Sequence, residues 1–467
     1  MKEKEHNEFE ITRGMYVTVR FLAFALCLLM LFFVGRAAIT FCLGLFASGD
    51  HLVQFPGQES PIVSVQEQTD KQPVYIDPSQ LVEIARADIT VAGDVMLHLP
   101  IVRTSQTGDG YNFDGIFTHV KPYIAAADYA VANLETTLSG TDGKEYTGFP
   151  NFNSPDQVAF SAKNAGFDML LTGNNHCYDY GTAGLERTLS TLKSCQLDTL
   201  GTVESSAETR HVVKNLNGIK VGMACYTSAD IDENGNVTIN GLTTDSTATG
   251  LINAFDYDKL SQFYTEVEGE IAAMRANGAE AIIVYLHWGD EFSTNASDNQ
   301  KAIAQKLCDL GVDVIAGSHP HVIQPIDLLT SSVDPAHRTI CLYSMGNFLS
   351  NQRADNISLT TGHSEDGVLF TFALTKYNDG SVRVSAINLL PTWVLVQGSG
   401  ENRDFYILPL NQTVTDWQSA YGLSEEQLSA AKNSYNRTMA LVTPGLNKVI
   451  PYLSEQNAAL DPALGVG

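Results

Sequence analysis

Residues 89–98 read ITVAGDVMLH, an apolar run that stops at Gly93 and is followed at once by Asp94. A short apolar run bounded by turn residues is typical of a strand that is buried on both of its faces. The stretch therefore predicts a buried strand over residues 89–93 with a carboxylate at its carboxyl end.

The same arrangement recurs along the chain, because five further predicted strands end in side chains that can bind a metal ion. Helical stretches separate most of them, and this alternation predicts an α/β fold in which sheets pack between helices, with mixed strand directions in the second half. The five strands and the residues after them are 129–134 with Glu135, 167–172 with Asn174, Asn175 and His176, 281–286 with His287, 312–316 with His319 and His321, and 339–343 with Asn347. Helices are predicted over 114–127, 155–165, 184–195, 256–276 and 299–310, and further strands over 220–226, 367–377 and 381–389.

In open α/β sheets, ligands bind beyond the carboxyl ends of the strands, so these side chains are expected to share one edge. Each motif alone is commonplace. Gly93-Asp94 is ordinarily a turn, and the Asn-Asn-His run at 174–176 can simply satisfy its own backbone. His319 and His321 indicate more, because Pro320 between them favours an extended chain beyond a strand. Together the motifs predict a mixed carboxylate, amide and imidazole site of the kind that binds Mn, Fe or Zn.

Composition excludes several classes of protein. The 467 residues are 44% hydrophobic and 17% charged, which excludes disorder over most of the length. The net charge of −25 argues against a protein that coats nucleic acid, because few cations are available to replace phosphate counterions. The seven cysteines form no C-x-x-C pair, so neither a zinc ribbon nor a thioredoxin-type site is indicated, and buried free thiols are expected.

The N-terminal region predicts a membrane anchor. Residues 21–34 read FLAFALCLLMLFFV, and four Lys or Arg residues precede them. This asymmetry predicts a cytoplasmic tail at 1–20, an uncleaved transmembrane signal-anchor at 21–46 and an extracytoplasmic remainder. A cleaved signal peptide with a site at 47–49 is the alternative. A proline-containing linker at 47–86, a folded domain at 87–395 and a helical extension at 396–467 complete the predicted organisation.

Seven short stretches together resemble one family, the bacterial CapA/PgsA-type poly-γ-glutamate capsule biosynthesis proteins, which are relatives of the calcineurin-like metallophosphoesterases. The stretches occur in the order typical of that family. They are GDVML at 93–97, NLE at 133–135, FNSP at 152–155, TGNNHCYDYG at 172–181, HWGDE at 287–291, GSHPHV at 317–322 and YSMGNF at 343–348. The resemblance implies a four-layer α/β/β/α sandwich of metallophosphoesterase type with a two-metal centre on one edge, following an N-terminal membrane anchor.

The resemblance also implies roles for individual residues. Asp94 looks like a ligand of the first of two divalent metal ions, and Glu135 stands where related phosphoesterases place a bridging carboxylate. Asn175 and His287 would serve the second ion, and His319 and His321 would complete both sites. His176 would be the acid beside the leaving group. Residues that look substrate-facing or supporting are Asn133, Asn174, Asp179, Glu291 and Asn347.

One position departs from the phosphoesterase pattern. Those enzymes have a second histidine two residues after the first aspartate, where this chain has Met96, and His98 is either a substitute ligand or a surface residue. Two functions therefore stay open. The first is a metal-dependent hydrolase or transferase acting on a phosphoester or an anionic polymer at the cell surface. The second is a non-catalytic polymer-binding or export subunit, working with other capsule-synthesis membrane proteins. A structural external domain without a site is a third, blander interpretation.

Overall fold

The computed structural model describes residues 81–108, 110–143, 145–400 and 402–460. The predicted tail at 1–20, the predicted membrane span at 21–46 and the linker up to residue 80 lie outside the described residues. Within the described ranges, every helix is too short or too polar to cross a bilayer.

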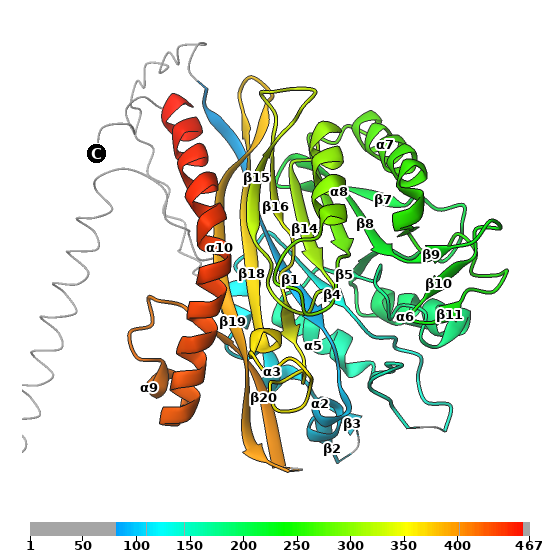
Figure 1. Cartoon of the computed structure of the whole chain (residues 1–467), viewed down its shortest axis with the longest axis vertical. Helices are drawn as coiled ribbons and strands as arrows, with labels where there is room; N and C mark the ends of the chain where they lie inside the picture. The colour runs from blue at the N-terminus through cyan, green and yellow to red at the C-terminus, as the bar shows by residue number, and fades with distance from the viewer. Residues whose placement is uncertain (1–80, 109, 144, 401, 461–467) are drawn as a thin grey trace, which may run out of the picture. The chain divides into compact units, whose positions relative to one another are not determined.

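Two mixed sheets form the centre of the described chain (Figure 1). Sheet one has eight strands in the order β20-β19-β18-β1-β4-β5-β6, with β17 beside β1, and sheet two has seven in the order β12-β8-β13-β14-β16-β15, with β7 beside β8. The strands of sheet one are β1 (Glu83–Val95), β4 (Tyr129–Leu134), β5 (Met169–Leu171), β6 (Asp198–Leu200), β17 (Asn347–Leu349), β18 (Asp366–Tyr377), β19 (Val382–Ser399) and β20 (Asn402–Pro409). Those of sheet two are β7 (His211–Leu216), β8 (Ile219–Ser228), β12 (Ala254–Phe255), β13 (Ala281–His287), β14 (Val314–Ser318), β15 (Ile326–Thr330) and β16 (Arg338–Leu342).

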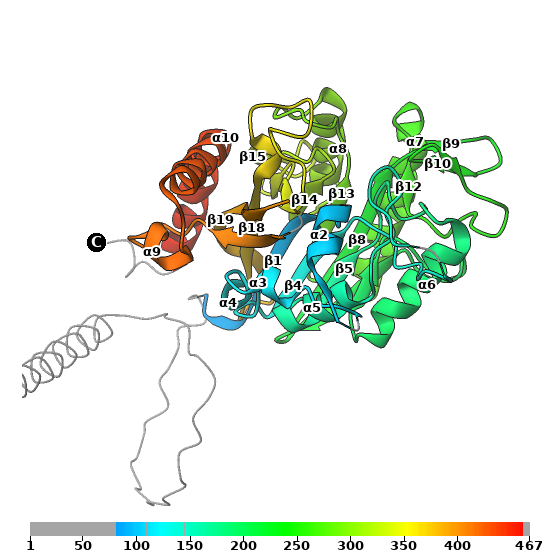
Figure 2. The same cartoon turned by 90° about the horizontal axis from the view of Figure 1, so that it is seen from below.

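The two sheets pack face to face, and helices cover their outer faces (Figure 2). One apolar cluster joins inward side chains of both sheets, a second joins sheet one to α2 through α6, and a third joins sheet two to α7 and α8. These helices are α2 (Leu99–Thr104), α3 (Asp114–Phe117), α4 (Lys121–Ile124), α5 (Gln157–Ala165), α6 (Gly181–Ser194), α7 (Leu260–Ala276) and α8 (Asp298–Asp309). Since the central strands are covered on both faces, they read as continuous apolar runs.

Side-chain alternation along these strands decides which residues reach the space between the sheets. Val131 of β4 and Tyr285 of β13 belong to the cluster between the sheets. Successive side chains of a strand point to opposite faces, so Asn133 and His287, two positions further on, point to the same side. The parallel strands β1, β4, β13 and β14 end at a common edge, where these polar residues take over from the apolar core.

Strand β1 reaches that edge through an irregularity at Gly93. The register with β4 shifts between Ala92 and Asp94, which turns the Asp94 carboxylate inward. A side chain at position 93 would put its Cβ 2.0 Å from the carbonyl oxygen of Gly346. Glycine is therefore required here, because only a residue without Cβ lets β1 approach this loop so closely.

The C-terminal part differs from the sequence prediction. β19 continues to Ser399 and β20 pairs with it, so the region from 396 begins with strands and becomes helical only at α9 (Trp417–Tyr421) and α10 (Glu425–Leu460). Pro391 explains the error, because a residue without an amide hydrogen argues against a continuing strand. β1 also begins at Glu83, before the expected domain start, and its first four residues mix charged Glu83 and Arg86 with Ile84 and Ala85 and are not buried.

The helix expected over 114–127 and the cysteines gave different outcomes. The helix expected over 114–127 is two short helices, α3 and α4, because Pro122 lacks the amide hydrogen that a continuous helix needs. Cysteine behaves as expected among the described residues, where the five thiols are free and buried.

Helix α10 is joined to sheet one by an ion pair. Arg437 donates from Nε and Nη2 to the two carboxylate oxygens of Asp366, at 2.9 and 2.7 Å. On the adjoining residue, Glu365 accepts from Arg353 at 2.8 Å. The buried carboxylate of Asp366 and the part-buried one of Glu365 are therefore each matched by a guanidinium group.

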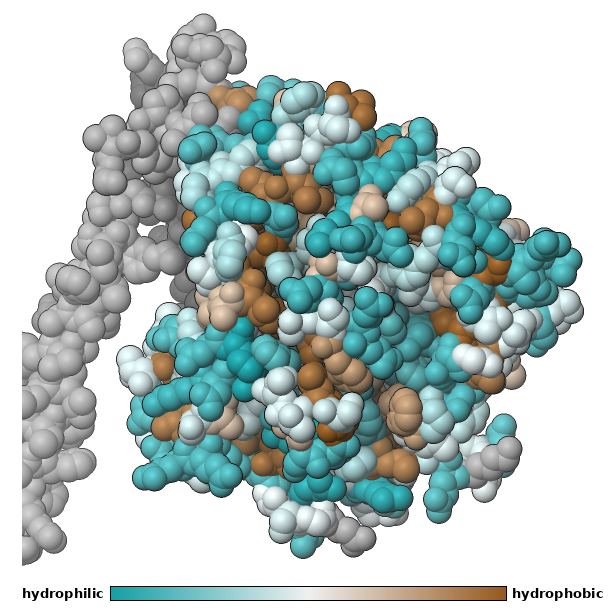
Figure 3. All heavy atoms as spheres, in the orientation of Figure 1, coloured by the Kyte–Doolittle hydropathy of each residue, from teal (hydrophilic) through white to brown (hydrophobic). Residues whose placement is uncertain are grey.

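The space-filling view of one face shows hydrophobic residues interspersed with hydrophilic ones (Figure 3). That face carries no single broad apolar patch on its described surface, so it gives no sign of a large apolar interface.

Candidate metal centre

Two fully buried carboxylates form the centre of the candidate site. Asp94, near the end of β1, and Glu135, directly after β4, both have 0% of their surface exposed. Asn133 lies between them, and its Nδ2 donates to Asp94 Oδ1 at 2.8 Å and to Glu135 Oε2 at 3.3 Å. One amide therefore orients both carboxylates toward the same space.

Histidines from sheet two face these carboxylates. His287 Nε2 and His321 Nε2 each lie 3.7 Å from Glu135 Oε1, and His321 Nδ1 lies 3.2 Å from Asp94 Oδ2. His319 Nδ1 and Asn175 Oδ1 lie 3.1 and 3.0 Å from His287 Nε2. All six predicted metal ligands therefore converge on one small volume, although their roles as ligands stay predictions.

The His-Pro-His segment is held in an unusual backbone conformation. His319 has φ 95° and His321 has φ 57°, values that residues other than glycine rarely adopt. Such outliers cost about 1–3 kcal/mol each and cluster at functional sites. Here they direct one ring toward His287 and the other toward Asp94.

Electrostatics distinguishes this cluster from an ordinary buried ion-pair network. Within the described ranges, no Lys or Arg pairs with Asp94 or Glu135. Burial, followed by the neighbouring Asp94 carboxylate, raises the pKa of Glu135 well above its usual value. Burial and adjacent histidines lower the pKa of His287 well below its usual value and that of His319 to about 3. The two imidazoles are thus neutral, which is the form that binds metals.

The residues present fit a divalent cation. Ligand atoms of Asp94, Glu135 and His287 all lie within 4.8 Å of one another, so this group could hold one metal ion. Glu135 Oε1 is buried without a hydrogen-bond partner although it faces two imidazole nitrogens. A buried carboxylate oxygen left without a donor is costly unless a cation compensates it.

His176 lies beside the cluster in a network of its own. Its Nδ1 is 2.7 Å from Asp179 Oδ2, and the backbone N–H of Phe152 donates to the same oxygen at 2.6 Å. Asn240 Nδ2 donates to Asp179 Oδ1 at 2.7 Å and to Pro150 O at 3.0 Å. Asp179 is therefore fixed from several sides, and it fixes the ring of His176.

Asn240 is a site residue that the sequence analysis did not identify. It lies in the turn between β10 (Val237–Ile239) and β11 (Leu242–Thr243), which pair with β9 (Asp230–Ile231) in a small separate sheet. Its φ of 48° is the left-handed conformation of an Asn-Gly hairpin turn. The Asn240-Gly241 pair in the sequence indicates a turn, but nothing in the sequence indicates that this turn packs against Asp179.

The remaining predicted residues have varied surroundings. Asn174 Nδ2 donates to Asn133 Oδ1 at 3.1 Å, which places it behind the carboxylates. Asn347, paired with Asp94 between β17 and β1, donates to Ser364 O at 2.8 Å. Glu291 is exposed and lies at the edge of the cavity beside the cluster. Ser318, which was not predicted, lies with its Oγ 3.0 Å from His287 Nδ1.

The two residues at the departure from the phosphoesterase pattern both line this cavity. Met96 is 1% exposed and offers a thioether but no N or O donor. His98 Nδ1 accepts from the backbone N–H of Asn351 at 3.3 Å, and burial with neighbouring histidines lowers the pKa of His98 to about 4. His98 is therefore a half-buried wall residue rather than a surface residue.

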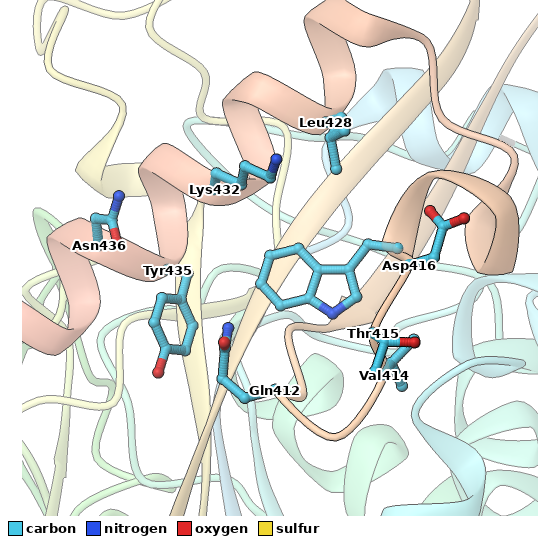
Figure 4. A pocket seen from close by; sticks show the side chains of 9 residues that line it. Gln412, Val414, Thr415, Asp416, Leu428, Lys432, Tyr435 and Asn436 are labelled. Carbon is cyan, nitrogen blue, oxygen red and sulfur yellow. The ribbon is translucent and has the colours of Figure 1, made fainter.

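Two of the larger cavities differ in their relation to the cluster. One of about 440 Å³ adjoins His176 and His321. Another, of about 370 Å³, lies between the loop before α9 and helix α10, with Asp416 from the loop and Lys432 and Tyr435 from the helix (Figure 4). The second cavity contains none of the predicted ligands, so the first one is the candidate substrate cavity.

Fold and site together define a mixed α/β protein with a candidate metal centre at the edge where two sheets meet. A family model described as the bacterial capsule synthesis protein PGA_cap matches residues 88–352, more than half of the chain. The chain therefore belongs to this family, and the resemblance to CapA-type capsule proteins is confirmed.

Several relatives carry related names. The capsule biosynthesis protein CapA of Bacillus anthracis is 28% identical over 291 residues, covering 61% of this chain and 65% of that protein. The PGA biosynthesis protein CapA of Bacillus subtilis (strain 168) is 25% identical over 301 residues, covering 64% and 70%. A probable polyglutamine synthesis accessory protein of Mycobacterium tuberculosis is 25% identical over 210 residues, covering 44% and 52%. The match thus spans just under two thirds of the B. anthracis protein.

A solved structure of the Thermus thermophilus sulfate thiohydrolase SoxB with glycerol covers 76% of this chain and 60% of its own, at 12% identity and a TM-score of 0.36. At this score the likeness supports no argument about the site.

Proposed function

We propose that this chain is a membrane-anchored, metal-dependent hydrolase or transferase that acts outside the cytoplasm in the synthesis of poly-γ-glutamate capsule or another cell-envelope polymer. One observation carries the proposal. Asp94 and Glu135 are fully buried side by side, and their described partners are amide and imidazole groups rather than Lys or Arg. A fold that buries two acidic groups without a basic partner leaves the compensating charge to a bound cation.

The arrangement supports two divalent ions of the Mn, Fe or Zn kind. Asp94 and His321 would hold the first, Asn175 and His287 the second, with Glu135 between them and His319 completing the set. When bound, such ions supply Lewis acidity that polarises a phosphoryl or acyl group. The four-layer sandwich of metallophosphoesterase type belongs to the same proposal, and the two packed sheets with outer helices support it.

His176 is the proposed general acid. Asp179 accepts at Nδ1, which leaves Nε2 as the atom that passes a proton to the departing group. A buried carboxylate on the other nitrogen fixes the orientation of the ring. Asn240, by donating to Asp179, positions this pair without facing the reacting group itself.

The proposed location rests on the N-terminal sequence. The apolar stretch within 21–46, preceded by four Lys or Arg residues, supports a single-pass anchor with the folded part outside. Anionic polymer or phosphoester substrates and other capsule-synthesis membrane proteins are the partners that this location supports.

The test combines metal analysis with turnover. Purified full-length chain is assayed for bound metal and for hydrolysis of phosphodiesters and γ-linked glutamate chains, with and without chelator. Metal-dependent turnover that is lost in His321→Ala, while the circular dichroism spectrum is retained, supports the proposal. Turnover that persists after chelation, or in His321→Ala, contradicts it.

Met96 favours a second candidate function. A buried thioether replaces an imidazole at one ligand position, which weakens one of the two metal sites. A non-catalytic subunit that binds the polymer for export would tolerate this loss. Polymer binding that survives chelation in a protein without turnover on any tested bond would favour this function over the first.

A further inference from the structure

The cavity beside the candidate metal centre is lined without strongly basic side chains among the described residues. Among the described residues that line it there is no Lys or Arg. Arg353, on the same loop as Asn351, is committed elsewhere, because it donates to Glu365 and to Val394 O, each at 2.8 Å. A ligand with several free negative charges would therefore meet no Lys or Arg in this cavity, whose basic lining residues are the imidazoles of His98, His176 and His321.

The polar groups in its wall include two that accept hydrogen bonds. Glu291 presents an exposed carboxylate at the edge. Asn351 Oδ1 is buried without any hydrogen-bond partner, although the Asn351 backbone is fixed through its N–H to His98 and its C=O to Asn356. An unpaired buried acceptor attracts a donor on a ligand, and a carboxylate has none to offer.

The rest of the wall is largely apolar. Phe149 is 76% exposed at the cavity, and Phe292, Phe152 and Ile357 line it together with Met96. Apolar walls with a few polar groups are typical of sites that bind a mostly uncharged ligand segment.

We infer that this cavity takes an uncharged, N–H-bearing segment with an apolar flank, such as a primary or secondary amide of a peptide-like chain, next to the group that reaches the metal cluster. A free α-carboxylate or a second phosphate at this position meets Glu291 and the lone pair of Asn351 without a Lys or Arg to balance its charge. The inference rests on the proposed function, because it takes the neighbouring cluster as the place of the reacting group. It narrows the substrate from any polyanion to one whose adjoining unit is amidated, peptide-bonded or otherwise neutral.

The experiment compares two nearly isosteric probes. Tri-γ-glutamate with free α-carboxylates and the same peptide with α-carboxamides are titrated calorimetrically into the full chain in the presence of chelator, so that metal does not contribute to binding. The carboxamide probe is expected to bind at least about 10-fold more tightly, the size expected for one charged hydrogen-bonded contact. Glu291→Gln should reduce this ratio to about 3-fold or less by improving carboxylate binding. Asn351→Leu should weaken carboxamide binding by about 5-fold.

Asp290→Asn is the matched control, since Asp290 is also exposed but does not line the cavity, and it should leave the ratio unchanged. Equal or tighter binding of the carboxylate probe, no binding of either probe, or an unchanged ratio in Glu291→Gln overturns the inference. Turnover assays of the metal-loaded chain separate it from the proposed function. If the chain prefers the carboxamide probe but has no turnover, only the proposed enzymatic function is contradicted. If it has turnover but prefers the carboxylate probe, only the inferred preference of the cavity is contradicted.

Discussion

Two sites with buried carboxylates in this protein differ in the groups that surround them. Where α10 meets sheet one, Asp366 is gripped by both donating nitrogens of Arg437, and burial raises the pKa of Asp366 only to about 6. At the sheet edge, Asp94 and Glu135 face each other with amides and imidazoles around them, and the pKa of Glu135 rises well above its ordinary value.

We interpret this difference as a difference in role. A carboxylate with its own guanidinium is complete within the folded chain and stabilises the attachment of α10. A carboxylate pair without a described cation is incomplete, and its surroundings supply further donors for a metal instead. Four changes to the protein test this contrast, and their expected effects decrease from the loss of Asp94 to the loss of the Asn240 side chain.

The largest effect is expected for Asp94→Asn. An amide in place of the carboxylate removes one negative ligand, so metal-dependent turnover should fall by about 1,000-fold, since even supporting residues of metal sites account for 10–100-fold. Bound metal, measured by elemental analysis, should fall in parallel while the fold is retained. Asp290→Asn, a neighbouring exposed change, is the control and should keep both quantities. An Asp94→Asn protein with full metal content and turnover would refute the assignment of the cluster.

At the other carboxylate, Arg437→Met should destabilise the protein without touching its metal content. It leaves Asp366 buried without its cation, and such a loss costs about 3–5 kcal/mol, measurable as a lower urea midpoint. The double variant Asp366→Asn with Arg437→Met should recover much of this free energy of unfolding. If the single and double variants unfold at the same midpoint, the ion pair is not what joins α10 to the sheet.

Metal removal should lower stability by a smaller amount. An ion that binds only the folded chain stabilises it by about 2.7 kcal/mol when its concentration is 100 times its dissociation constant. Chelation should therefore lower the unfolding midpoint in wild type and have a much smaller effect in Glu135→Gln. In chelator, Glu135→Gln should be at least as stable as wild type, because it removes a buried negative charge whose Oε1 has no hydrogen-bond partner. A chelation effect of equal size in both proteins would speak against Glu135 as a ligand.

The smallest effect is expected for Asn240→Gly. Glycine keeps the left-handed turn, whose φ is 48°, and deletes the amide that donates to Asp179 and to Pro150 O and lies 3.2 Å from His176 Nδ1. Turnover, kcat, should fall by about 10-fold with KM unchanged, because the residue positions His176 through Asp179 and does not face the substrate. Asn217→Gly is the matched control, another left-handed asparagine (φ 51°) in a hairpin turn that donates to Arg86 O instead. Equal kcat values for the two variants would leave Asn240 without a role in catalysis.

Much of the fold was predictable because strand signals are local. The apolar run at 129–134 is β4 without change, and 281–286 is β13 within one residue. The errors lie where a local signal misleads. Pro122 divides an apparently continuous amphipathic helix, and Pro391 conceals a strand that runs through it.

The candidate site was predictable to the extent that it lies at strand ends. Asn133 and His287 lie at the carboxyl ends of strands whose alternation already directs them between the sheets. Asn240 was not predictable, since its bond to Asp179 spans 61 residues and depends on how the small hairpin folds against the loop. The exposure of Glu291 was equally unreadable, because the HWGDE stretch looks the same for a buried or an exposed glutamate.

By itself, the sequence determined the central strands, the longer helices, the acidic balance, the family and the kinds of side chain found at the ends of those strands. These depend on preferences that act over a few residues. Only the tertiary structure decided that Asp94 meets His321, 227 positions away, while Asp366 meets Arg437, 71 positions away. Charge pairing depends on which strands and helices pack together, and no local preference encodes that packing. Therefore only the three-dimensional structure revealed that Asp94 has no Lys or Arg partner among the described residues.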